Sequence, residues 1–450
     1  MRNFWLAALV AVAGCSNDPL PPPDVELLIG QETDTWTADP APTRVRIDLV
    51  TATERKNIGE SNAPVSVITV KDPQVASGTI ATVEATGTDA AGGTAVHGQS
   101  VPYVIYGFAN ATIPLFVGRP SMWSRPPQQL EHIRNFPVVT VIRAQLVLSV
   151  GGEGPDLNPA IPDVYDAVNW KAGAGEAALA RAPKSIAIVR RGMLLINDNG
   201  ATWIDLDGYE SPNEPAAPAG LSFAEVSGGE VFELTDGTAY VVGATRLGGE
   251  PTNKVLRIDR YGFMRVLTLS VPRRGAAAGI VAGSLVVWGG SAEGAGAEVM
   301  NKAQEAFTSL PYPPDPSSGL GLATLEGNTA IVAGGKDAMT GAPLPMRTFD
   351  VTCAADCAAA DSLPLPVALS RTHIYPVTGQ MLVTGDAEDG EFRAFSVVTT
   401  SGTAEVVERP LRERRKAATS VLLPNGQPAV LGGHNPETME GVRNIESFFF

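Results

Sequence analysis

The feature that most constrains this chain is a short motif that recurs along most of its length. In residues 279–290, GIVAGSLVVWGG, two apolar runs flank Gly283, and the second run ends in Gly289-Gly290. This pattern predicts a β-hairpin, because glycine adopts the positive φ of a tight turn. The same pattern ends near positions 151, 198, 243, 289, 334, 385 and 432, which are 47, 45, 46, 45, 51 and 47 residues apart. Such regularity predicts a repeat architecture.

Each interval has room for two further strands. After position 243 the runs 254–260 and 263–271 fill it, and after position 385 the runs 391–400 and 404–411 do. Four strands in about 47 residues match one blade of a β-propeller. Blades bury both sheet faces only against neighbouring blades, so seven such units predict a closed ring.

Several units add features that resemble a known family. An apolar strand, Gly-Gly, a loop and a third strand are followed by an aromatic residue and a Pro/Arg-rich link, as in AFTSLPYPP (306–314). This order resembles the kelch motif of propellers such as the central domain of galactose oxidase, although the second and third repeats lack Gly-Gly. The resemblance implies an all-β, seven-bladed kelch-type propeller over residues 113–450. Arginines precede the first strands of five units (Arg134, Arg181, Arg274, Arg371 and Arg415).

The two ends of the repeat region predict how the ring closes. The last repeat supplies three strands, the third within NIESFFF (444–450), and one strand is then missing. Residues 115–127, which include Trp123, stand alone before the first hairpin. We expect them to supply the outermost strand of the last blade, so that mixed N- and C-terminal strands close the ring.

The first fifteen residues predict a targeting signal. Arg2 gives the positive start, and a short apolar run follows that is too short to span a bilayer as a helix. The small residues before Cys15 resemble a bacterial lipobox, which implies a lipoprotein signal peptide at 1–14, acylation of Cys15 and outer-membrane sorting. Residues 15–24 are rich in proline and predict a stiff tether. The expected location is the bacterial cell envelope, with membrane contact through the N-terminal lipid.

Residues 25–112 contain short β-type runs separated by Pro, Gly, Asp and Asn. They predict a small antiparallel β-sandwich of Ig-like pattern without an internal disulfide, acting as a spacer or docking module. The formal net charge of −15 argues against a nucleic-acid partner, because a phosphate backbone would be repelled. We expect a monomer.

The two remaining cysteines lie four residues apart, at Cys353 and Cys357. Outside the cytoplasm a local disulfide is favoured over a metal site, since the nearest histidine, His373, is sixteen residues further on. The cysteine pair lies within the longest interval, between positions 334 and 385. We therefore expect it in an insertion.

No catalytic constellation stands out. The chain has four histidines (His97, His132, His373 and His434), and the histidine pair and linked cysteine of kelch-type copper oxidases have no counterpart. NDNGATW (197–203) resembles an Asp-box, which we interpret as a hairpin turn, and DLDG (205–208) lacks further oxygen ligands for calcium. We assign no catalytic, cofactor-binding or metal-binding residue.

These observations favour a lipid-anchored scaffolding protein that binds an envelope protein or glycan through the loop face of the propeller. The loops after the second strands, for example 152–163, 244–253 and 336–345, are its variable elements. The alternative is a carbohydrate-active or oxidative enzyme that uses the central funnel. Convergence of three or more Arg, His, Glu and Tyr side chains at the ring axis would favour the enzyme.

Overall fold

The structure is a computed structural model that describes residues 23–450, except 106–110, 155–157, 176–177, 206–210, 212, 338, 378 and 401–402. The expected signal peptide (1–14), Cys15 and most of the tether lie outside the described residues. Within them the chain is almost entirely β-structure, with two single-turn 3-10 helices, η1 (Phe223–Glu225) and η2 (Gly243–Thr245). Neither has the length or the apolar character to cross a bilayer.

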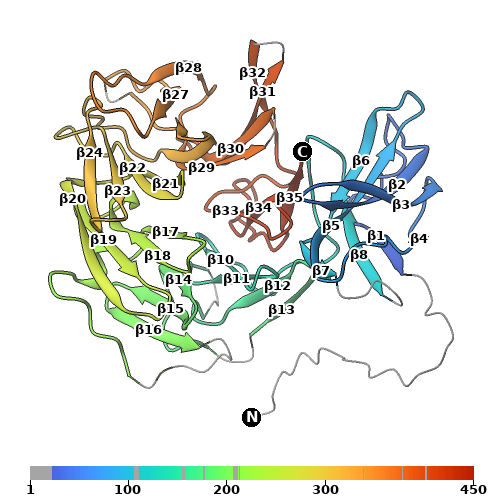
Figure 1. The fold of residues 1–450 in the computed structure, drawn as a ribbon, viewed down its shortest axis with the longest axis horizontal. Coiled ribbons are helices and arrows are strands. Elements are labelled where there is room, and N and C mark those ends of the chain that lie inside the picture. Colours follow the sequence, from blue (N-terminus) through green and yellow to red (C-terminus); the bar gives the residue numbers. More distant parts are fainter. Residues whose placement is uncertain are drawn as a thin grey trace.

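Six four-stranded antiparallel sheets and one three-stranded sheet form the C-terminal part of the described chain (Figure 1). The first three contain β10 (Val138–Ile142), β11 (Leu146–Val150), β12 (Asp163–Asp166) and β13 (Lys171–Ala174); β14 (Ser185–Val189), β15 (Gly192–Asn197) and β16 (Gly200–Asp205); and β17 (Glu230–Glu233), β18 (Ala239–Val242), β19 (Thr252–Ile258) and β20 (Met264–Arg273). The next two contain β21 (Ala277–Val281), β22 (Ser284–Trp288), β23 (Ala297–Asn301) and β24 (Ala306–Leu310); and β25 (Gly321–Glu326), β26 (Thr329–Ala333), β27 (Pro345–Asp350) and β28 (Ala360–Pro364). The last two contain β29 (Ser370–Val377), β30 (Gln380–Asp386), β31 (Phe392–Thr400) and β32 (Thr403–Glu408); and β33 (Thr419–Leu422), β34 (Pro428–Leu431), β35 (Glu446–Phe449) and β9 (Met122–Ser124). Each sheet is named below by its first strand.

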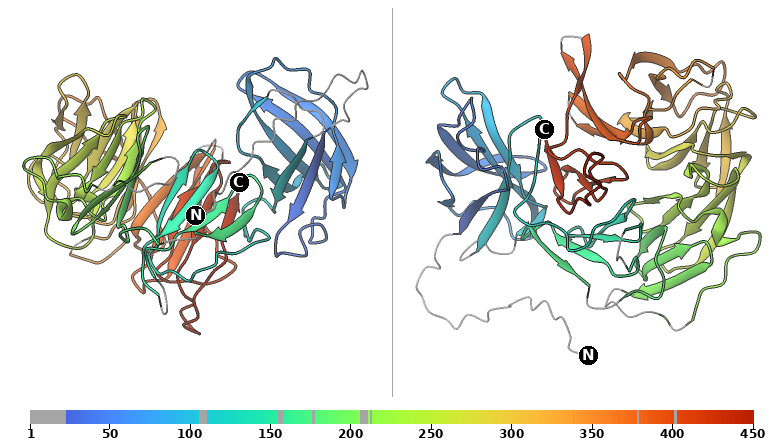
Figure 2. Two further views of the ribbon diagram at one scale, coloured as in Figure 1. Left: turned by 90° about the horizontal axis from the view of Figure 1, so that it is seen from below. Right: turned by 180° about the vertical axis from the view of Figure 1, so that it is seen from behind.

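The sheets stand side by side around a common axis, which is the arrangement of a β-propeller (Figures 1 and 2). Separate clusters of buried apolar side chains fill the spaces between consecutive sheets, and one cluster joins the β33 sheet to the β10 sheet. The ring is therefore continuous, and its cores lie between sheets because each face needs a neighbour.

The paired glycines have a geometric cause. Both glycines adopt positive φ in all four pairs: Gly151-Gly152, Gly289-Gly290, Gly334-Gly335 and Gly432-Gly433. A Cβ on Gly432 would lie 2.5 Å from the carbonyl oxygen of Arg134 in the neighbouring β10 sheet, and one on Gly433 would lie 2.3 Å from the carbonyl oxygen of Lys416. Gly432 thus permits close contact with the link that leads into the β10 sheet. Gly433 permits the β33–β34 hairpin to contact the link that precedes β33.

Three of these glycine pairs are bound by a buried arginine. Nη1 of Arg273 donates to the Gly289 carbonyl at 2.7 Å, and its Nη2 lies 2.9 Å from Oε1 of Glu298. Arg134 repeats this arrangement with Gly151 and Asp163, and Arg415 with Gly432 and Glu446. Arg274 precedes β21 as expected, but its side chain is exposed, and the neighbouring Arg273 is the buried arginine.

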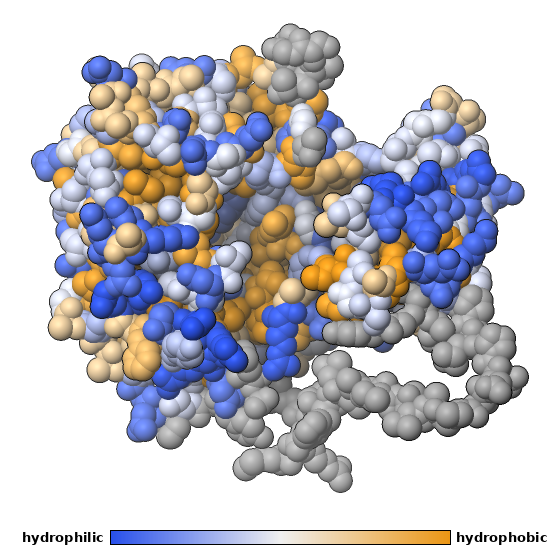
Figure 3. Space-filling view, viewed as in Figure 1, coloured by the Kyte–Doolittle hydropathy of each residue, from blue (hydrophilic) through white to orange (hydrophobic). Residues whose placement is uncertain are grey.

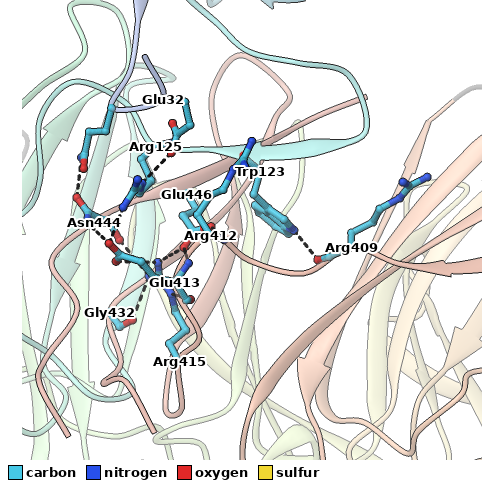
Figure 4. A network of polar contacts seen from close by, with 11 residues as sticks. Glu32, Trp123, Arg125, Arg409, Arg412, Glu413, Arg415, Gly432, Asn444 and Glu446 are labelled. Atoms are coloured by element: carbon cyan, nitrogen blue, oxygen red, sulfur yellow. Dashed lines mark hydrogen bonds and ion pairs between the residues drawn. The ribbon is translucent and has the colours of Figure 1, made fainter. Parts of the chain in front are cut away.

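The ring closes through the strand expected from before the first hairpin. β9 pairs antiparallel with β35, and Trp123 lies opposite Phe448. The two rings lie 5.2 Å apart at their centroids, and both side chains are buried. The Nε1 of Trp123 also donates to the Arg409 carbonyl at 2.9 Å (Figure 4).

The N-terminal part forms two facing sheets around its own apolar core. One sheet has the order β4-β1-β8, and the other has β3-β2-β5-β6 with β7 paired to β5. The strands are β1 (Asp24–Ile29), β2 (Arg44–Thr51), β3 (Arg55–Asn62), β4 (Val67–Thr69), β5 (Thr79–Thr88), β6 (Thr94–Gln99), β7 (Tyr103–Ile105) and β8 (Thr112–Val117). β1 and β8 pair in parallel, whereas a wholly antiparallel sandwich was expected. Residues 113–117 thus lie in this sheet rather than in the ring.

The N-terminal sheets are packed against the seam of the ring. Phe116 of β8 lies 5.1 Å from Trp170 and 5.3 Å from Phe449, measured between ring centroids. Arg125 joins Glu32 of the N-terminal part to Glu413 of the ring, at 2.8 and 2.7 Å (Figure 4). Aromatic packing and a shared ion-pair network together attach this part to the closing sheet.

Candidate functional site in the central channel

A large cavity lies at the axis of the ring. It has a volume of 840 Å³ and is lined by residues of the first strands β10, β14, β17, β29 and β33 and of the links before them. Figure 3 shows the corresponding hollow at the centre of the ring. First strands border the channel because each is the innermost strand of its sheet, as the order within each sheet requires.

One end of the channel opens among the variable loops. Each first strand pairs antiparallel with its second strand, so the links that precede first strands and the loops that follow second strands share one face. Gly152, Glu153 and Pro159 come from such a loop, and Ala182, Pro183 and Lys184 come from such a link; all six line the cavity. We call this end the link face.

Glu230, at the start of β17, places a carboxyl group in the channel without a counterion. Among the described residues no side chain donates a hydrogen bond to it, and no ion pair includes it; its backbone N–H donates to Thr245. The residue is half-buried, because channel water reaches it, yet protein surrounds the carboxyl group. This desolvation raises the pKa of Glu230 to about 8, so the carboxyl is protonated at neutral pH.

His373 of β29 lines the same cavity. Desolvation, with a smaller effect of the positive charge on Arg371, lowers the pKa of its imidazole to about 4. Tyr375, two residues along the strand, donates to Oγ of Ser420 at 2.9 Å. Burial raises the pKa of Tyr375, and the negative charge of Glu230 raises it further, so Tyr375 and Glu230 interact across the channel. Neutral donors and acceptors therefore predominate here.

Arg371 and Phe136 lie at the mouth of the channel. The guanidinium carbon of Arg371 lies 3.9 Å from the centroid of the Phe136 ring, and Nε of Arg371 binds Oδ2 of Asp386 at 2.5 Å. Burial raises the pKa of Asp386, and Arg371 partly offsets that effect. Because Phe136 precedes β10 and Arg371 lies in β29, this contact joins two sheets that are not neighbours and narrows the opening.

The other histidines do not reach the channel. Nδ1 of His132 lies 2.9 Å from Oδ1 of Asp163, and Nδ1 of His434 lies 3.0 Å from Oδ1 of Asn135. His97 belongs to β6 in the N-terminal part. Glu230, Arg371 and His373 all line the cavity, so the condition set for favouring an enzyme, convergence of three such side chains, is met.

The remaining candidate motifs occupy structural positions. Asn197 to Trp203, the Asp-box-like segment, forms the turn between β15 and β16, where Oδ1 of Asn197 accepts from the N–H of Asn199 at 3.0 Å. Most of DLDG lies outside the described residues. The Sγ atoms of Cys353 and Cys357 are joined in a disulfide, with a Cα–Cα distance of 5.9 Å. No group of three or more His, Cys, Asp or Glu side chains suited to a metal ion occurs among the described residues.

Comparison with known proteins gives no family. No known protein family matches the chain, and no curated protein does. Solved structures with a similar outline include a streptogramin B lyase (11% identity, TM-score 0.48, covering 72% of this chain and 97% of that one) and YjhT (10%, 0.43, 72% and 96%). A catalytically inactive virginiamycin B lyase from Staphylococcus aureus with quinupristin is also similar (13%, 0.47, 72% and 98%). At TM-scores below 0.5 these likenesses carry no inference about the activity of this chain.

Proposed function

We propose that the protein is a lipid-anchored envelope protein that binds a glycan in the central channel of its propeller. The proposal includes the finer features expected from the sequence: a lipid on Cys15, an Ig-like N-terminal domain and a seven-bladed ring of kelch type. The two facing N-terminal sheets and the seven consecutive sheets of the described chain support the last two.

The observation that carries the proposal is the polar lining of the channel. A cavity of 840 Å³ that opens among variable loops contains Glu230 without a counterion and His373 without a hydrogen-bond partner among the described residues. Both residues are half-buried, so their polar groups remain accessible to a ligand in the channel. A ligand with hydroxyl groups would satisfy both, while the valines of β10 and β17 would contact its apolar faces.

A glycan array probed with the mature ectodomain tests the proposal. Wild-type protein should bind a defined subset of glycans, and His373→Ala should weaken that binding at least tenfold because an imidazole hydrogen bond is lost. His97→Gln, in the N-terminal part, is the matched control and should bind as the wild type does. If no glycan binds, or if both variants bind equally well, the channel is not the binding site. Recovery of an envelope protein with wild type alone would instead favour the scaffolding interpretation.

A second candidate function, an acid–base enzyme, is favoured by the opposite pKa shifts of two channel groups. A carboxyl group with a pKa near 8 can donate a proton at neutral pH, and an imidazole with a pKa near 4 can accept one. The pH dependence of activity would then be bell-shaped, with its maximum between these two pKa values. A screen of chromogenic glycosides with wild type and Glu230→Gln tests this, and absence of turnover by the wild type eliminates it for that substrate class.

A further inference from the structure

Some of the charged side chains that line the channel have a partner of opposite charge, and others have none. Of the two basic residues in its lining, Lys184 binds Oδ2 of Asp198 at 2.5 Å and Arg371 binds Asp386. Both side chains therefore already have a carboxylate partner at the mouth of the channel.

The two glutamates of β17, Glu230 and Glu233, differ in whether the carboxyl group has a partner in the protein. Oε1 of Glu233 accepts the backbone N–H of Ile188 at 3.1 Å, on the edge of β14. Glu230 has no such donor, and burial alone accounts for its raised pKa, so no cation of the described residues is close enough to stabilise its charged form. The groups that face it from other elements, His373 and Tyr375, are neutral at pH 7.

A carboxyl group inside a cavity without a counterion is suited to a ligand that brings one. Phe232, two residues from Glu230 on the same strand, also lines the cavity, and the face of an aromatic ring attracts cations. An ammonium group beside Glu230 would stabilise the carboxylate, because opposite charges attract strongly where water is scarce. The formal net charge of −15 for the whole chain favours approach of a cation.

We propose that the glycan bound in the channel is an amino sugar, whose free ammonium group pairs with the carboxylate of Glu230. This inference rests on the proposed glycan-binding function and specifies its ligand class. Binding then converts a protonated carboxyl into a carboxylate, and the proton passes to the buffer. An N-acetylated sugar has no charge to offer and should bind without this proton release.

Calorimetric titration of the mature ectodomain with three matched disaccharides tests the inference. The probes are the disaccharide of glucosamine, its N,N′-diacetylated form and cellobiose, each measured at pH 6, where the ligand amine is protonated, in two buffers of different ionisation enthalpy. We expect the amino disaccharide to bind at least tenfold more tightly than the other two disaccharides. Its binding should release a proton to the buffer, whereas binding of the other two should release none. Glu230→Gln should abolish the preference and the proton release, whereas the control Glu405→Gln, at an exposed position of the outer strand β32, should keep both.

The outcomes separate the inference from the function on which it rests. Binding of cellobiose or the acetylated disaccharide with equal or higher affinity overturns the amino-sugar inference and leaves glycan binding intact. A preference for the amino disaccharide that survives in Glu230→Gln also overturns it, because the ammonium group then pairs elsewhere. Failure of all three probes to bind wild type overturns it too, and the glycan array then decides the fate of the proposed function. Thermal melting of both variants at the wild-type temperature shows that loss of binding is not loss of fold.

Discussion

The sheets that begin with β10, β21 and β33 differ from those that begin with β17 and β29 in how their polar groups are satisfied. In the first group a buried arginine joins the glycine pair to a carboxylate of the third strand. The second group lacks the glycine pair and contributes four of the six charged or titratable side chains that line the channel: Glu230, Glu233, Arg371 and His373. The regular sheets thus maintain the ring, and the irregular ones carry the candidate site.

This division has a physical basis. A buried ion pair with every hydrogen bond made fixes its surroundings and leaves nothing for a ligand to bind. Arg371 belongs to an irregular sheet, and its partner Asp386 keeps one oxygen, Oδ1, without a hydrogen bond among the described residues. In the three buried ion pairs of the regular sheets, by contrast, no buried side-chain nitrogen or oxygen lacks a hydrogen bond.

The largest expected effect tests the regular group. Arg273→Ala would leave Glu298 buried without its partner and should lower the free energy of unfolding by about 3–5 kcal/mol. Arg274→Ala removes an exposed neighbour of the same type and should change it by less than about 0.5 kcal/mol. Urea denaturation followed by circular dichroism measures both. Equal effects would show that the buried ion pair does not stabilise the ring.

A somewhat smaller effect is expected at the glycine pairs. Gly432→Ala would place a Cβ 2.5 Å from the Arg134 carbonyl at a φ of +70°, and we expect a loss of about 3 kcal/mol. Gly327→Ala, in a hairpin turn at a φ of +55° with no atom within 4 Å of the new Cβ, should cost about 1 kcal/mol. The difference isolates the contact between sheets from the backbone preference, and urea midpoints measure it. A cost as low at Gly432 as at Gly327 would mean that neighbouring sheets adjust freely.

The glycine positions show how much of the fold can be predicted from the sequence. Glycine spacing predicts the hairpins and their repeat, because turn geometry is local. The strand before the first hairpin was expected to complete the last sheet, and the pairing of β9 with β35 agrees. Arg274 precedes β21 as expected, but whether Arg273 or Arg274 is buried depends on the packing of the β21 sheet, which the sequence does not show.

The candidate site was not predictable in the same way. Glu230 and His373 come from β17 and β29, and only closure of the ring brings these strands to one cavity. Neither residue stands in a recognisable motif, and the signal that could have indicated Glu230 is an acidic residue at the start of a first strand, EVFE, whose middle is apolar. β3 was also missed, because RKNIGESN lacks an apolar alternation.

The third prediction concerns the irregular group and depends on pH. The folded-state pKa of Glu230 is about 8, above its value of 4.5 in the unfolded chain, so the folded state holds a proton that the unfolded state releases. Glu230 therefore lowers the free energy of unfolding: this effect is absent below pH 4.5 and grows as the pH rises toward 8. Glu230→Gln should therefore be more stable than wild type at pH 9, on the order of 2 kcal/mol, and equally stable at pH 4. Thermal melts across this range check the sign, and a constant difference at every pH would contradict it. Glu405→Gln, at an exposed position of β32, is the control.

The smallest expected effect concerns the loop between Cys353 and Cys357, which lies outside both groups. Unreduced protein, acylated at Cys15, should contain no titratable thiol, and detection of two would end the assignment of the disulfide. The double variant Cys353→Ser, Cys357→Ser should lose less than about 2 kcal/mol, because a loop this short removes little entropy from the unfolded chain. The buried Cys357 belongs to the apolar cluster between the β21 and β25 sheets, and the half-buried Cys353 packs against it. A loss of stability larger than that of Gly432→Ala would mean that the disulfide constrains the β21 and β25 sheets rather than its own loop alone. The disulfide would then belong with the elements that maintain the ring.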